Sequence, residues 1–173
     1  HHTLTGMEGS DAVLTYLVPD EDAGLVVLPT HRIAAKSLRA FAGSLAELCQ
    51  FDTLALLEKA LAASKNPYAF GLIEGGYWLG TPHSPGGCRS GLAVEGRGSQ
   101  LFAGTSPDEL SYTPDAALAE KMAREKKGAA VLVKPFTVAQ VRKAAKAVGL
   151  LPQKSTYFYP KIATGLAFRP LAP

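Results

Sequence analysis

The sequence has 173 residues, of which 47% are hydrophobic and 19% are charged. This length fits one globular domain of about 100–200 residues, and the composition excludes a disordered chain and a collagen-like repeat. The net charge of +3 is too small to indicate a nucleic-acid-binding protein by itself.

The cysteines and the hydropathy pattern restrict the class of protein further. Cys49 and Cys88 are far apart and neither belongs to a CxxC pair, so a zinc ribbon and a thioredoxin are not indicated. A reducing cytoplasm is the simplest setting for such thiols. The chain lacks the run of about 18 apolar residues that spans a bilayer, and no signal-peptide pattern opens it. We therefore expect a cytoplasmic protein with no membrane partner.

The first predicted elements are strands. Ala12–Val18 and Gly24–Pro29 are rich in aliphatic residues and flank a polar stretch, which predicts an antiparallel hairpin of largely buried strands. Ile33–Leu48 then carries apolar residues at helical spacing, and Asp52 or Thr53 can cap a further helix. We predict two helices or one broken helical region there.

A second hairpin and a long loop follow. Phe70–Ile73 and Tyr77–Leu79 flank Glu74-Gly75-Gly76, whose glycines allow the positive φ of a tight turn. Thr81–Ser111 is rich in glycine and poor in aliphatic residues, which predicts a long loop. Loops of that length are usually functional or disordered, and the sequence leaves both alternatives open.

The last third alternates helices and strands. Thr137 and Gln140 have the spacing of a capping box at the start of one of these helices. With the two hairpins, this order predicts an α+β single domain, with helices packed on a mixed or antiparallel sheet. The predicted elements are the helices Asp115–Lys127 and Thr137–Val148, the strand Ala129–Lys134, and the extended runs Ser155–Tyr159 and Ile162–Phe168.

Thr30, His31 and Arg32 form the first candidate site. They follow an apolar strand and precede the predicted helical region, so a hydroxyl, an imidazole and a guanidinium would meet where helix N–H groups are free to bind an anion. The alternative is purely structural. In it Thr30 caps the helix, His31 bonds to the backbone and Arg32 pairs with a carboxylate such as that of Asp22.

The second candidate site is a donor-rich segment near the end of the sequence. Lys154, Ser155, Thr156, Tyr157 and Lys161 offer donors suited to phosphate or carboxylate oxygens. Strand alternation puts Ser155 and Tyr157 on one face and Lys154 and Thr156 on the other, unless Pro160 bends the strand. The alternative is an edge strand whose lysines and proline prevent aggregation.

Several common catalytic motifs are absent from the sequence. It contains no HExxH, GxSxG, Walker A or GxGxxG motif, which argues against zinc proteases, α/β-hydrolases, P-loop enzymes and Rossmann dehydrogenases. No metal ligands are assigned from the sequence.

Three segments resemble one known family. Gly24–Ile33 (GLVVLPTHRI), Tyr112–Asp115 (YTPD) and Ala129–Leu171 resemble the C-terminal half of the DUF1015 family of uncharacterised prokaryotic proteins. Lys154–Lys161 together with Gly165-Leu166 is the most specific part of this resemblance.

The resemblance implies a phosphate-binding motif upstream of Thr30. Members of the family are longer than this chain and carry an Asp-Gly-His-His-Arg motif, which is similar to the phosphate-gripping turn of the ParB and sulfiredoxin superfamily. His1 and His2 match its histidines, whereas Thr3 stands in place of the arginine. Either the chain lacks the nucleotide-binding half, or these histidines belong to a purification tag and the motif lies elsewhere.

The same resemblance implies two alternative functions. Because the superfamily includes free-serine kinases, the first is a phosphotransferase acting on a hydroxy-amino acid, with ATP or ADP and Mg²⁺. His31 and Arg32 would be catalytic and, together with Lys154 and Lys161, would neutralise phosphate charge. The second is a noncatalytic module that binds a nucleotide or another small anion. Nucleic acid is not an expected partner, because Thr137–Val148 is basic but has no base-reading signature.

Overall fold

The chain divides into two compact units. The computed structural model describes residues 17–19, 21–83, 101–102, 105–148, 154 and 156–161. One unit comprises His1–Val26 and Phe158–Pro173, and the other comprises Val27–Tyr157. In the first unit, Asp22 organises a turn by accepting a hydrogen bond from the Gly24 N–H at 2.7 Å.

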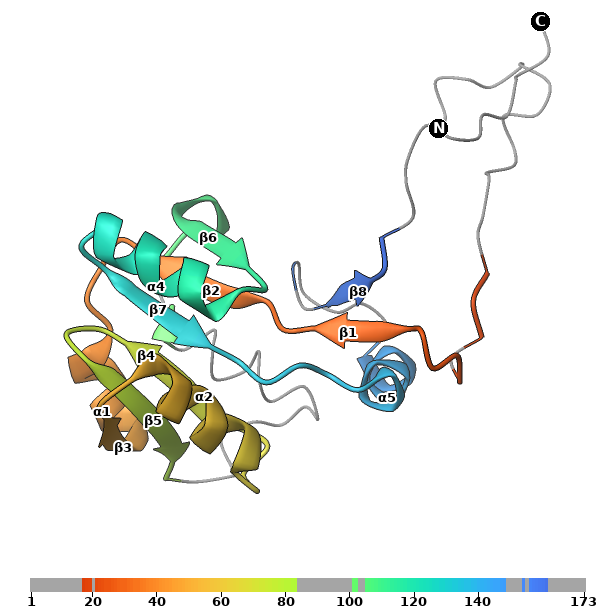
Figure 1. The fold of residues 1–173 in the computed structure, drawn as a ribbon, viewed down its shortest axis with the longest axis horizontal. Helices are drawn as coiled ribbons and strands as arrows, with labels where there is room; N and C mark the ends of the chain where they lie inside the picture. The colour runs from red at the N-terminus through yellow and green to blue at the C-terminus, as the bar shows by residue number, and fades with distance from the viewer. Residues whose placement is uncertain are drawn as a thin grey trace, which may run out of the picture. The chain divides into compact units, whose positions relative to one another are not determined.

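The second unit contains a six-stranded sheet in which every neighbouring pair is antiparallel. The strand order is β3-β5-β4-β7-β2-β6 (Figure 1). A separate two-stranded sheet pairs β1 (Val26–Leu28) with β8 (Tyr157–Tyr159). The strands of the large sheet are β2 (His31–Ala34), β3 (Ala46–Phe51), β4 (Phe70–Ile73), β5 (Tyr77–Pro82), β6 (Leu110–Thr113) and β7 (Ala129–Leu132).

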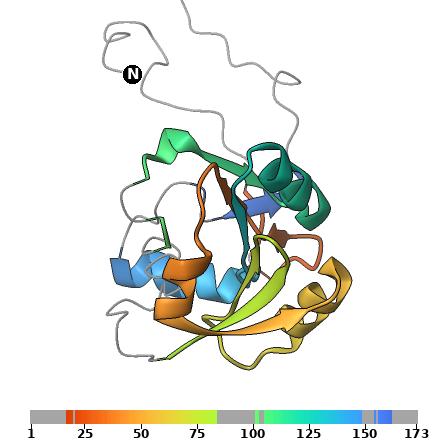
Figure 2. The same ribbon diagram turned by 90° about the vertical axis from the view of Figure 1, so that its left-hand side faces the viewer.

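Helices cover both faces of the large sheet. The described helices are α1 (Arg39–Leu45), α2 (Leu54–Ala63), α4 (Ala116–Glu125) and α5 (Val138–Val148), with a short 3₁₀ turn, η3 (Pro107–Glu109). Figure 2 shows α1 on one side of the sheet and α2 with α4 on the other. The α+β prediction with an antiparallel sheet and packed helices is therefore confirmed. Within the described residues, no helix is long and apolar enough to cross a membrane.

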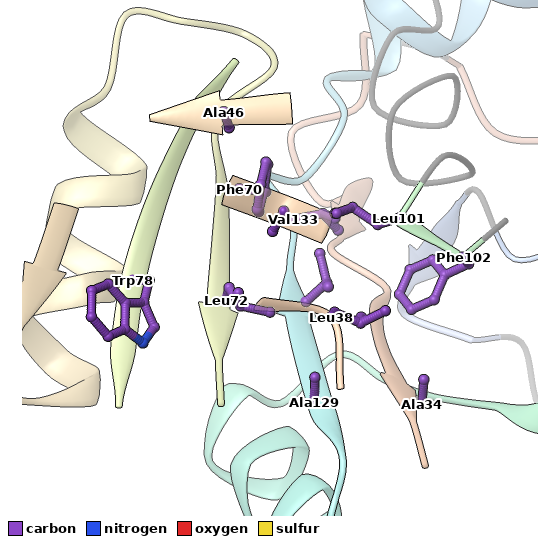
Figure 3. Packing of buried hydrophobic residues seen from close by; sticks show 12 residues of the cluster. Ala34, Leu38, Ala46, Phe70, Leu72, Trp78, Leu101, Phe102, Ala129 and Val133 are labelled. Atoms are coloured by element: carbon purple, nitrogen blue, oxygen red, sulfur yellow. The ribbon is translucent and has the colours of Figure 1, made fainter. Parts of the chain in front are cut away.

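Among the described residues, the core consists of two clusters separated by the sheet. Along β7, Ala129 and Val131 belong to the cluster beneath α1, whereas Ala130 and Leu132 belong to the cluster beneath α2 and α4. This alternation follows from the side-chain period of two in a strand. Figure 3 shows the first cluster, to which Leu101 and Phe102 add buried side chains. Because β7 is buried on both faces, its sequence is apolar throughout.

Local capping signals place three helices correctly. Thr53 Oγ1 accepts from the Leu56 N–H at 3.3 Å, and Asp115 Oδ1 accepts from the Leu118 N–H at 2.8 Å. Thr137 and Gln140 exchange two hydrogen bonds of 2.8 and 3.2 Å, as a capping box requires. The predicted starts of α2, α4 and α5 are thereby confirmed.

Two predictions from the first half of the sequence differ from the structure. Ile33–Leu48 is not a continuous helical region, because it holds the end of β2, the short helix α1 and the start of β3. In the first predicted hairpin, residues 12–16 lie outside the described residues, and the side chain of Leu17 is 87% exposed. The partner of β1 is β8.

The predicted loop Thr81–Ser111 differs from the structure at both ends. Thr81 and Pro82 belong to β5, whereas Leu110 and Ser111 belong to β6. Residues 84–100 lie outside the described part of the chain.

Glu74 connects the β4–β5 turn to the start of α1. Its Oε2 accepts hydrogen bonds from the backbone N–H groups of Leu38 at 2.7 Å and Arg39 at 2.8 Å, and Ser37 Oγ donates to Oε1. The Arg39 guanidinium lies over the Trp78 ring, 3.9 Å from its centroid. A single carboxylate therefore satisfies backbone donors that the helix leaves unpaired at its N-terminus.

Glu74→Ala is expected to lower the free energy of unfolding by about 1–2 kcal/mol, because the backbone donors of α1 lose their acceptor. Urea denaturation measures the change. Glu47→Ala is the matched control, since Glu47 is exposed on β3 and is expected to be nearly neutral. Equal losses in the two variants would contradict the role given to Glu74.

Candidate functional site

Thr30, His31 and Arg32 do not lie at a strand-to-helix junction. His31 and Arg32 are the first residues of β2, and no helix begins beside them. The prediction that helix N–H groups bind an anion there is wrong. These residues form a strand because they pair with distant parts of the chain. β6 and β7 flank β2, with His31 opposite Thr113 and Arg32 opposite Val131.

Strand alternation separates the two residues predicted to be catalytic. His31 lines a pocket beneath α2, on the face where Ile33 packs. Arg32 is the next residue of β2, so its side chain lies on the opposite face. The His31 and Arg32 residues are only 5% and 8% exposed. The two side chains therefore cannot act together on one ligand in this structure, which corrects the predicted catalytic pair.

Thr30 is buried just before β2. Its Oγ1 has no hydrogen-bond partner among the described residues. It does not cap a helix, so this part of the structural alternative is wrong, whereas the part that gives His31 a backbone hydrogen bond is confirmed.

The second predicted segment is described in part. Lys154 is exposed with φ +60°, Thr156 precedes β8, and Tyr157 is the first residue of β8. Ser155 lies outside the described residues, and Lys161 belongs to the other unit. A shared ligand site for this segment and His31 stays a prediction.

A small pocket opens where β2 begins and β7 ends. Its volume is about 180 Å³, and it lies between these strands and α2. The walls are mostly apolar, and three side chains bring polar groups to it. The lining residues are Pro29, His31, Glu58, Leu61, Ala62, Pro114, Leu132, Val133, Lys134 and Pro135.

His31 brings a neutral imidazole to this pocket. Its Nδ1 accepts a hydrogen bond from the Val133 N–H at 3.2 Å, so the neutral ring carries its proton on Nε2. Burial lowers the pKa of His31 to about 4, and the nearby Asp115 carboxylate opposes this effect. At pH 7 His31 can donate one hydrogen bond but supplies no positive charge. This neutral form differs from the charge-neutralising role that the sequence predicts for His31.

Lys134 brings an ammonium group to the same pocket. Its Nζ donates to the backbone oxygens of Ser64 and of Asn66, the latter at 3.2 Å, and burial lowers its pKa. No carboxylate in the described part of the chain lies within the 4.0 Å of an ion pair with this nitrogen. An ammonium has three protons, so one remains for a ligand after the two carbonyl bonds.

Glu58 completes the polar lining of the pocket. It is an exposed residue of α2 and does not form an ion pair with Lys134. The pocket thus combines an imidazole N–H, an ammonium and a carboxylate with apolar walls. Glu58 and Lys134 are not among the site residues predicted from the sequence. The only signal for them in the sequence is a lysine two residues after the buried strand Ala129–Leu132.

The volume of this pocket favours a ligand smaller than a nucleotide. Ligand pockets commonly have volumes of about 300–1,000 Å³, and this one is smaller, at about 180 Å³. Among the described residues, no group of three or more His, Cys, Asp and Glu side chains could hold a metal ion.

Comparison with protein-family models, with curated proteins and with solved structures finds no match.

Proposed function

We propose that this chain is a binding module for a small anion, such as a phosphate or carboxylate, in the pocket of His31 and Lys134. The observation that carries the proposal is the Lys134 ammonium. It is partly desolvated and fixed by two carbonyl oxygens, and no carboxylate of the described residues pairs with it. A bound anion would supply the opposite charge that burial of an ammonium favours.

His31 supports the same ligand chemistry. Because Nδ1 is occupied by the Val133 N–H, the free ring position is a donor, Nε2–H. A neutral donor beside a cation matches the ionised oxygens of phosphate and carboxylate, which accept hydrogen bonds.

The pocket volume limits the size of the anion. A water molecule occupies about 30 Å³ in the liquid, so a volume of about 180 Å³ equals roughly six waters. Inorganic phosphate or a small carboxylic acid is of that size. We therefore propose an anion of a few heavy atoms as the ligand.

Lys134→Met is expected to weaken phosphate or acetate binding by about tenfold or more, because it removes a charge-assisted hydrogen bond. Isothermal titration of the full chain with sodium phosphate and with sodium acetate measures the loss, against sodium chloride as blank. Lys121→Met is the matched control, since the Lys121 ammonium is exposed on α4, 4.0 Å from Glu125. Equal affinity in both variants, or no binding of either anion to the unmodified chain, would refute the proposal.

Phosphoryl transfer to a hydroxy-amino acid is a second candidate. It rests on the resemblance to the DUF1015 family and on one observation, the carboxylate of Glu58 in the same pocket as Lys134. Phosphotransferases place a carboxylate beside the acceptor hydroxyl and cations beside the transferred group. ATP-dependent phosphorylation of serine that disappears in Glu58→Gln would favour this candidate. Anion binding without phosphorylation of serine would favour the binding module instead.

A further inference from the structure

A larger pocket lies between the β4–β5 turn and the C-terminal half of α4. Its volume is about 330 Å³, and Ile73, Gly76, Tyr77 and Ala123 contribute to its walls. The polar side chains around it are Glu74, Glu120 and Arg124. None of these residues lines the pocket of His31 and Lys134, so this is a separate cavity.

Glu120 has a carboxylate oxygen that can accept a hydrogen bond from a ligand in this pocket. Its Oε1 accepts hydrogen bonds from Tyr77 OH at 2.8 Å and from Arg124 Nη2 at 2.6 Å. Oε2 accepts no hydrogen bond from the described residues, although the side chain is only 19% exposed. A carboxylate oxygen is a strong acceptor, so a pocket lined by it favours a ligand that donates.

The end of α4 and the aromatic residue beside the pocket favour the same kind of ligand. Both Glu74 oxygens are already bonded to the start of α1. Ala123 and Arg124 belong to the last turn of α4, where the helix dipole presents its negative end. Tyr77 also lines the wall, and an aromatic ring attracts cations.

We propose that this pocket binds a small free amine, whose ammonium donates to Glu120 Oε2 and whose alkyl stem packs against Ile73 and Ala123. The volume suits this size, since about 330 Å³ equals roughly eleven waters. The ligand class is a primary alkylammonium with a short apolar chain.

Arg124 makes the proposal sharply testable. Its guanidinium already bonds to Glu120, and its side chain is 78% exposed. An ammonium at Oε2 therefore competes with a neighbouring cation for one carboxylate. Removing Arg124 should strengthen amine binding, whereas removing the charge of Glu120 should weaken it. A ligand held only by the apolar walls would show neither change.

The experiment is isothermal titration of the full chain with n-butylammonium chloride, with n-butanol as the uncharged probe of the same shape. We expect n-butylammonium to bind and n-butanol not to bind. Glu120→Gln should weaken binding by up to about fivefold, the size expected for a partly exposed ion pair. Arg124→Met should tighten it severalfold. Glu125→Gln, an exposed residue on the same helix, should leave it unchanged.

The variants also separate this site from a folding effect and from the anion pocket. Glu120→Gln keeps an amide oxygen that can accept from Tyr77 OH, and its thermal midpoint reports whether the fold survives. Lys134→Met should bind n-butylammonium as the unmodified chain does. Equal binding of n-butanol, or unchanged affinity in a folded Glu120→Gln variant, would overturn the proposal, as would weaker binding in Arg124→Met.

Discussion

Replacing Gly128 by alanine is expected to destabilise the fold by about 3 kcal/mol or more, because the added methyl group meets rigid backbone. A Cβ at Gly128 would lie 1.9 Å from the backbone oxygen of Ala34 and 2.8 Å from Ala35 Cα. These atoms cannot move away easily, since Ala34 pairs with Ala129, the residue after Gly128. Urea denaturation followed by circular dichroism measures the loss.

Gly43→Ala is the matched control for this prediction. Gly43 is exposed in α1, and the atom nearest to its added Cβ is Leu48 Cδ1, at an ordinary 3.8 Å. Alanine in a helix is more favourable than glycine by about 0.5–1 kcal/mol, so this variant should be neutral or slightly stabilised. A loss below about 1 kcal/mol in Gly128→Ala would contradict the close approach.

Stability is expected to fall as the pH is lowered from about 6.5 to about 4, because His31 has its ordinary pKa of 6.5 when unfolded and a pKa of about 4 when folded. In that window the unfolded chain binds more protons than the folded chain, so the free energy of unfolding rises with pH. The full pKa shift of His31 corresponds to a loss of about 3 kcal/mol in the free energy of unfolding. This loss is complete at a pH below the pKa of the folded state. Urea titrations between the two pKa values measure the slope.

His31→Asn should remove this contribution to the pH dependence. The asparagine Oδ1 can accept from the Val133 N–H in place of Nδ1, and an amide does not titrate in this range. His83→Asn is the control, because His83 is exposed and its loss should leave the slope intact. The same slope in His31→Asn as in the unmodified chain would show that other groups are responsible.

Elements specified by neighbouring residues could be predicted from the sequence. Gly75 and Gly76 have φ values of +58° and +149°, and the turn they form joins β4 to β5 as the sequence predicts. The caps at Thr53, Asp115 and Thr137 work in the same way, since each acts within three residues. Short-range chemistry therefore accounts for α2, α4, α5 and this hairpin.

Elements that depend on distant partners could not be predicted in the same way. Ile33 and Ala34 look helical in their local context, but they pair with β6 and β7. The candidate site shows the same limit. His31 was identified from the sequence, but in a charged role, whereas its burial lowers its pKa and favours the neutral ring. Glu58 and Lys134 line the same pocket only because α2 packs beside the end of β7. No spacing in the sequence indicates that they lie together.

The position of β2 also determines when the sheet can form during synthesis. Both strands that flank β2 are made much later, because β6 begins at Leu110 and β7 at Ala129. The β4–β5 hairpin can close as soon as it leaves the ribosome, whereas β2 must wait with both edges unpaired. Long-range pairing of this kind is slow, and an unpaired apolar strand is prone to aggregate. Nascent chains that end before Leu110 should therefore be the species that most needs a chaperone.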